Sequence, residues 1–411
     1  MAALVNFLTA GYIIAVNPEI LSQVGMSKSA LVSATCYSAA IGCFLMAFLA
    51  RAPILLAPGM GLNAFFAYTL CLNEGVQWQI ALGIVFLSGV TFVVLSILGL
   101  RERILYSIPH GLRMAIPVGI GLFIAFIGFT NMGLITEHPV TLVSLAPISK
   151  TVIIALIGLG LVFLLNYYKV PGSLLFVIIG ITIFSILLGW NNWPDTIISS
   201  PPSIEPTALK LDIISAIKPI YWVPIFVFLY IDLFDSLGSL TAVSYEAGLT
   251  KGEDVPRLGR MFLSDALATT FGSLLGTSTV TAYVESGAGV AVGGRTGWTA
   301  LFTGLLFLIA PFFYGFISVI PSYATSIALI IVGIYMIKHI RNIEFTSWIE
   351  GPPAFLTIIL MPLTFSIATG LCFGILSYVL ILIGAGRINK INPILAIVFI
   401  LSILYLIFRS H

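Results

Sequence analysis

The chain has 411 residues, of which 59% are hydrophobic and only 8% are charged, and its mean hydropathy is +1.12. This composition is far too apolar for a soluble domain, and it predicts an all-α protein that crosses a membrane many times. The net charge of +2 comes from basic residues spread over the predicted loops, which excludes the basic cluster of a nucleic-acid-binding protein.

Apolar runs of about the length of a membrane span recur along the whole chain. The predicted spans lie near residues 1–16, 30–49, 79–99, 112–131, 150–167, 172–189, 222–244, 262–275, 298–316, 324–338, 353–384 and 393–409. The first run has no Lys or Arg before Lys28 and so lacks the basic flank of a secretory signal peptide. We expect it to remain as the first span.

Two further apolar pieces, 62–72 and 283–292, are too short to cross a membrane as helices. The first follows APGMG and the second follows GTSTVT, and both stretches favour irregular or extended backbone. Paired interruptions of this kind indicate the binding site of a transporter. The two pieces are third and tenth among 14 segments, which predicts a 7+7 inverted repeat with two half-helices.

The basic residues suggest an orientation in the membrane. With a cytoplasmic N-terminus, the predicted outer loops hold six of the 18 basic residues: Lys28, Lys150, Lys210, Lys218, Arg387 and Lys390. Inner loops such as those with Arg101, Arg103 and Lys251 hold the others, so we expect both termini on the cytoplasmic side of the cell membrane. Of these six, Arg387 and Lys390 lie on the unexpected, outer side of the membrane unless the long run 353–384 folds back as two segments.

Acidic residues inside the segment 222–244 are the first candidates for a functional site. Asp232, Asp235, Ser236 and Ser239 share one helical face, and a carboxylate at bilayer depth costs at least roughly 2.5 kcal/mol. We expect Asp235 and Ser239 to contact the substrate. Asp232 is either a structural residue that pairs with a neighbouring hydroxyl or a third proton-exchanging carboxylate.

The second half-helix contributes Glu285 and Thr279. Glu285 lies near its N-terminus, where it can either face the substrate or cap the helix. Thr279 belongs to a predicted short strand, and its hydroxyl either contacts the substrate or only reflects β-strand preference.

The first half-helix contributes Asn63 and Phe65. Asn63 follows APGMGL, and it can act as an N-cap or present its amide to a cavity. Phe65 offers either a stacking surface for a planar ligand or a core side chain.

Other function classes lack their sequence signals. The four cysteines form no CxxC pair and the four histidines show no ligand spacing, so we expect neither a metal site nor a cofactor. We also find no nucleophile–base constellation of an enzyme and no repeated filter residues of a channel.

Five strings resemble the AzgA-type purine permeases, within the wider nucleobase and ascorbate transporter group. They are NFLTAGYIIAVNPEIL, APGMGLNAFFAYTL, FLYIDLFDSLGSL, GTSTVTAYVESGAGVAVGGRTG and PAFLTIILMPLTFSIATG, and they follow the family order. The resemblance implies that Asn63, Asp235 and Glu285 bind the purine.

The resemblance also implies a core domain and a gate domain. Segments 1–4 and 8–11 would form the core domain, residues 1–105 and 221–320, and segments 5–7 and 12–14 the gate domain, residues 106–190 and 321–411. The polar stretch 191–220 would connect the two halves.

The chemistry of the candidate residues suits a purine base, because a carboxylate can accept two N–H groups from its edge. Two carboxylates that face one cavity repel each other, so we expect protons to bind there together with the substrate. The predicted function is purine import (hypoxanthine and guanine, or adenine) by proton symport through Asp235, Glu285 and Asp232. The alternative is a carrier of uracil, xanthine or another small planar anion on the same fold, and a homodimer stays open.

Overall fold

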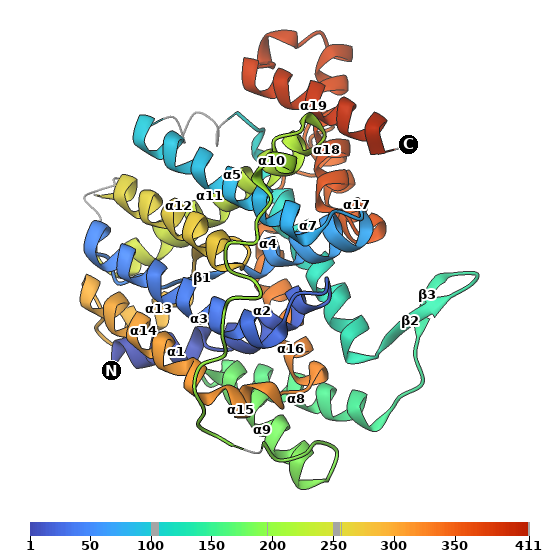
Figure 1. Cartoon of the computed structure of the whole chain (residues 1–411). Helices are drawn as coiled ribbons and strands as arrows, with labels where there is room; N and C mark the ends of the chain where they lie inside the picture. Colours follow the sequence, from blue (N-terminus) through green and yellow to red (C-terminus); the bar gives the residue numbers. More distant parts are fainter. Residues whose placement is uncertain (100–106, 195, 250–254, 256, 410–411) are drawn as a thin grey trace.

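The computed structural model of the chain describes residues 1–99, 107–194, 196–249, 255 and 257–409 (Figure 1). The predicted inner-loop residues Arg101, Arg103 and Lys251 lie outside this part. The described chain is a bundle of helices with two small two-stranded sheets.

The first half contains the following elements: α1 (Ala2–Ala10), α2 (Ile13–Ser22), α3 (Lys28–Leu45), η1 (Met46–Ala50), β1 (Leu56–Pro58), α4 (Met60–Ala64), η2 (Phe65–Asn73), α5 (Trp78–Leu98), α7 (His110–Met132), β2 (Ile135–His138), β3 (Leu142–Leu145), α8 (Lys150–Tyr167) and α9 (Ser173–Leu187). The second half contains these: α10 (Ile213–Ala216), η3 (Pro219–Tyr221), α11 (Trp222–Glu246), α12 (Leu258–Leu275), β4 (Val280–Ala282), α13 (Ser286–Ala291), α14 (Gly297–Ile309), η4 (Ala310–Phe313), α15 (Tyr314–Ser318), α16 (Ser322–Met336), η5 (Ile337–Asn342), α17 (Gly351–Thr364), α18 (Ile367–Gly384), η6 (Ile388–Lys390) and α19 (Pro393–Arg409).

The predicted multi-span architecture is confirmed. Within the described residues, nine helices are long and apolar enough to cross a membrane, and α9, α17 and α19 are shorter apolar helices. The hairpin of β2 and β3 was not predicted, and it projects from the bundle between α7 and α8 (Figure 1).

The two predicted interruptions meet at the centre of the fold. Strand β1 and strand β4 pair antiparallel, with Leu56 opposite Ala282 and Pro58 opposite Val280. Each strand leads into a short helix, α4 or α13, as expected for a half-helix. Helix α12 comes close behind β4, since a Cβ atom on Gly272 would lie 2.8 Å from the Val280 side chain.

Two groups of helices surround this crossing. Helix α3 packs against α2, α12 and α14, whereas α7 packs against α16 and α17. The segment after α9 runs along the first group, where Ser33 donates to the Pro202 carbonyl (2.8 Å) and the Asp212 amide donates to the Gln79 carbonyl (2.8 Å). The predicted connector is therefore attached to α3 at Pro202 and to α5 at Asp212.

The long apolar run 353–384 is two helices rather than one span. Phe365, between α17 and α18, adopts a left-handed conformation (φ 50°), and Ser366 then caps α18 by accepting from the Thr369 amide. The helices return antiparallel, because Gly370 approaches Met361 and Gly374 approaches Thr357. The predicted topology requires this fold-back if Arg387 and Lys390 are to lie on the cytoplasmic side.

Helix α19 then leads away from the end of the bundle where α7 begins. Asn392, before α19, donates to the Ser107 carbonyl (2.8 Å), whereas the Tyr405 hydroxyl donates to Glu74 at the far end of α5. Helix α5 has 21 residues, which span about 31 Å. That both termini lie on the cytoplasmic side stays a prediction.

Candidate functional site

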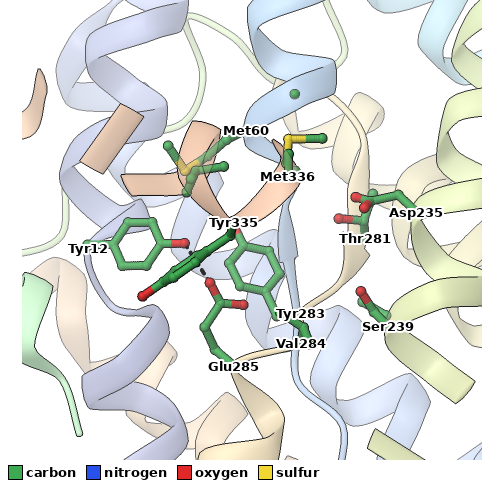
Figure 2. A pocket seen from close by; sticks show the side chains of 14 residues that line it. Tyr12, Met60, Asp235, Ser239, Thr281, Tyr283, Val284, Glu285, Tyr335 and Met336 are labelled. Carbon is green, nitrogen blue, oxygen red and sulfur yellow. Dashed lines mark hydrogen bonds between the residues drawn. The ribbon is translucent and has the colours of Figure 1, made fainter. Parts of the chain in front are cut away.

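A small cavity of about 110 Å³ lies beside the strand crossing (Figure 2). Its walls come from Tyr12, just before α2, and from the start of α4, α11, β4, the start of α13 and α16. At the edge of the cavity, the backbone of Gly59 comes close to β4: a Cβ atom on Gly59 would lie 2.8 Å from the Thr281 hydroxyl. A larger side chain at this position would therefore push the two strands apart.

Helix α11 supplies Asp235 and Ser239 to the cavity. These residues are four apart and so lie on one helical face. In Figure 2 the Asp235 carboxylate lies beside the Thr281 hydroxyl of β4, with Ser239 below it. The structure thus brings together two of the residues that the sequence predicted.

Glu285 reaches the same cavity from the residue before α13. It occupies the N-cap position, but its side chain makes no capping hydrogen bond. Its Oε1 atom instead accepts from the Tyr12 hydroxyl at 3.0 Å, and the rings of Tyr12, Tyr283 and Tyr335 gather around the carboxylate (Figure 2). Glu285 is therefore oriented by a side chain from the first span.

A second, larger cavity of about 980 Å³ shares Asp235, Ser239 and Glu285 with the first. It extends from them to His110 at the start of α7 and His339 in η5. The small cavity thus communicates with one end of the bundle.

Asp232 does not line either cavity. It is fully buried, and its Oδ2 atom accepts from Thr269 of α12 at 3.1 Å. A third aspartate, Asp265 of α12, lies next to it and accepts from Ser236 at 2.5 Å. Asp265 was missed in the sequence because it lies close to the predicted start of its span.

Asn63, Phe65 and Thr279 are also placed away from both cavities. Asn63 lies inside α4, where Gly59 is the N-cap, and its amide donates to the Asn17 side chain (2.6 Å). Phe65 packs against Phe228, with ring centroids 4.8 Å apart. Thr279 is buried in the chain before β4. Substrate contact by these three residues stays a prediction, whereas the N-cap role of Asn63 is wrong.

Sequence reasoning missed Tyr12, Tyr335 and Met336, which all line the small cavity. Each belongs to an apolar helix whose neighbours in space cannot be read from local spacing. Tyr12 carried one weak signal, a polar group within the GYIIAVNPEIL run.

Within the residues described, no group of three or more His, Cys, Asp or Glu side chains could hold a metal ion. The site therefore offers carboxylates, hydroxyls and aromatic rings. These groups can bind a planar, uncharged molecule that presents several N–H groups.

Comparisons with known proteins agree with this chemistry. Residues 1–373 match the Xan_ur_permease model, described as the Permease family. The chain is 40% identical to the guanine/hypoxanthine permease PbuG of Bacillus subtilis over 422 residues, covering 99% of this chain and 96% of PbuG. It is 38% identical to the adenine permease AdeP of Escherichia coli over 411 residues, covering 99% and 92%.

The fold also has solved relatives. The transmembrane domain of a cyanobacterial bicarbonate transporter, BicA, superposes with a TM-score of 0.66 at 16% identity, over 90% of this chain and 96% of that one. This likeness confirms the predicted 7+7 inverted-repeat fold with core and gate domains.

Proposed function

The chain belongs to the Permease family, and from this premise we propose that it is a secondary transporter that imports purine nucleobases. Its relatives bear the names of guanine/hypoxanthine and adenine permeases, which indicates a transporter rather than an enzyme. The observation that carries the proposal is the meeting of Asp235 and Glu285 in one cavity at the strand crossing.

The two carboxylates suit the edge of a purine. A carboxylate accepts N–H groups through two oxygens, and hydrogen bonds to a charged acceptor are the stronger ones. The Tyr12 hydroxyl already occupies one oxygen of Glu285, and the tyrosine rings offer flat surfaces for the base. Asn63, Phe65 and Thr279 remain in the proposal as residues that would reach the base in another conformation.

The location of the cavity suits alternating access. Asp235 and Glu285 belong to the predicted core domain, whereas Tyr335 and Met336 belong to the predicted gate domain. Movement of the core against the gate would carry the base past α16, in the way that inverted-repeat transporters expose a site to each side.

The larger cavity gives the access side in this proposal. It opens where α7 begins and η5 ends, and this end carries Arg113, Lys338, Arg341, Arg387 and Lys390. Basic residues accumulate in cytoplasmic loops, so we assign this end to the cytoplasm and the conformation to an inward-facing state.

Proton symport through Asp235, Glu285 and Asp232 is the proposed energy source. Support comes from the placement of these carboxylates inside predicted spans. Within the described residues none of them forms an ion pair, and the salt bridge found there joins Lys28 to Glu19. Carboxylates without a cationic partner at this depth are stabilised by protons.

Uptake of labelled hypoxanthine, guanine, adenine, xanthine and uracil in cells without their own nucleobase permeases tests the substrate class. We expect a purine to accumulate, and Asp235→Asn, made at the same expression level, to abolish this. Accumulation of uracil alone would support the alternative carrier, although the residues around the small cavity include no Lys or Arg to attract an anion.

A further inference from the structure

We propose that Asp232 and Asp265 form a binding site for the coupling proton, separate from the substrate cavity. This inference rests on the proposed function, because only a proton-driven transporter needs such a site. Asp265 had no role in the sequence-based interpretation, and neither aspartate touches the cavities.

The two carboxylates are held diagonally across a pair of antiparallel helices. Asp232 of α11 accepts from Thr269 of α12 at 3.1 Å, while Asp265 of α12 accepts from Ser236 of α11 at 2.5 Å. Ser236 follows Asp232 by four residues and Thr269 follows Asp265 by four, which is one helical turn in both cases. The two carboxylates therefore lie about one helical turn apart. The hydroxyl next to Asp232 is that of Thr269, and the hydroxyl next to Asp265 is that of Ser236.

Both carboxylates are incompletely satisfied. Asp232 and Asp265 are fully buried, and the Oδ1 atom of each has no hydrogen-bond partner. Burying an unpaired ionised carboxylate is strongly unfavourable, and two such neighbours repel each other as well. A bound proton removes one charge and turns one carboxyl group into a donor.

Within the described residues, no Lys or Arg side chain forms an ion pair with either carboxylate. The other titratable groups on the helices around the pair are Tyr230, Asp235, Tyr245 and Glu246 on α11, Arg260 on α12, Lys28, Cys36, Tyr37 and Cys43 on α3, His110 and Arg113 on α7, and Glu285 before α13. Arg113 acts on Tyr230 rather than on the pair. Arg260 is exposed and lies more than one turn before Asp265. Helix α5 and strands β1 and β4 contain no ionisable side chain.

Strand β4 joins this pair to the substrate cavity. On one side, the Thr269 hydroxyl lies within hydrogen-bond distance of both Asp232 (3.1 Å) and the Val280 carbonyl (2.9 Å), and its single proton can be donated to only one of them at a time. On the other side, Thr281 and Ala282 line the small cavity. A change of protonation at the pair and a change of occupancy in the cavity would therefore act on the same three-residue strand.

The test uses purified full-length protein in proteoliposomes, with hypoxanthine, guanine and adenine as probes. Asp265→Asn should keep exchange of labelled for unlabelled base at equal pH within about threefold of the wild type. It should lose at least tenfold of the accumulation driven by an inward proton gradient, and base entry should no longer acidify the lumen. Asp232→Asn, on the other helix, should behave alike, and the matched control Asp212→Asn in the connector should behave as the wild type.

The outcomes separate this inference from the proposed function. If the wild type shows no proton-driven accumulation, proton symport itself is wrong. If the wild type is proton-driven and both variants accumulate base normally, or both lose exchange as well, the proton-site proposal is overturned. If Asp265→Asn is not recovered folded, Ser236→Ala removes only its hydroxyl donor and should change the pH profile of accumulation at an unchanged exchange rate; an unchanged profile would contradict the proposal.

Discussion

Neutralising Glu285 without changing its shape tests the proposed substrate site most directly. In Glu285→Gln the amide oxygen can still accept from the Tyr12 hydroxyl, which is 3.0 Å from Oε1 in the wild type. The local fold should therefore persist. What disappears is the negative charge that would accept N–H groups of the base in the cavity.

The expected size of the effect follows from that single loss. A hydrogen bond to a charged group contributes about 1.5–3 kcal/mol, and every 1.4 kcal/mol changes the dissociation constant tenfold. We expect the preferred purine to bind roughly 10- to 150-fold more weakly, and accumulation to be lost.

Binding of the labelled base to purified protein measures this change. Glu344→Gln provides a matched control, because Glu344 is exposed in the loop after η5 and lines neither cavity. A dissociation constant equal to that of the wild type in Glu285→Gln would refute the role of this carboxylate in binding.

Three further predictions concern coupling and the architecture around the cavity. Uptake into vesicles should collapse when a protonophore is added and should not change when K⁺ replaces Na⁺; sodium-dependent uptake would reject proton symport. Asn63→Ala leaves the Oδ1 atom of buried Asn17 without this donor, so we expect a loss of about 1–3 kcal/mol in stability, seen as a lower Tm. Because the proposal has Asn63 reach the base in another conformation, we also expect a changed ranking of purines; an unchanged ranking would confine Asn63 to its structural role. Gly59→Ala should cost about 1–3 kcal/mol through overpacking against Thr281 and weaken base binding, and normal binding and stability would contradict the close approach of the strands.

Much of the architecture was predictable because membrane spans are defined by local composition. The interruptions at 62–72 and 283–292 were found from length and Gly, Pro, Ser and Thr content alone. The division of 353–384 was harder, since its break at Phe365 is an apolar residue in a left-handed conformation. Pro362, Thr364 and Ser366, which lie close to it, were local signals, and Ser366 does cap the next helix.

The site was predictable only in part. Asp235, Ser239 and Glu285 are polar residues in apolar segments, and such residues are rare enough to be noticed. Tyr12 and Tyr335 fit any apolar helix, so their meeting at Glu285 depends on long-range packing. That Asn63 binds Asn17 rather than facing the cavity likewise depends on how α2 and α4 come together.

The pairing of β1 with β4 has a consequence for how the protein is made. The Leu55 amide binds the Ser286 hydroxyl across 231 positions of the chain, so the crossing cannot form until most of the polypeptide has been synthesised. Contacts between distant parts of a chain form slowly, and unpaired strand edges expose incomplete chains to misassembly. The first-half strand must therefore wait in the membrane with unpaired backbone groups, and a nascent chain that ends before β4 should be a target for quality control rather than a partly active permease.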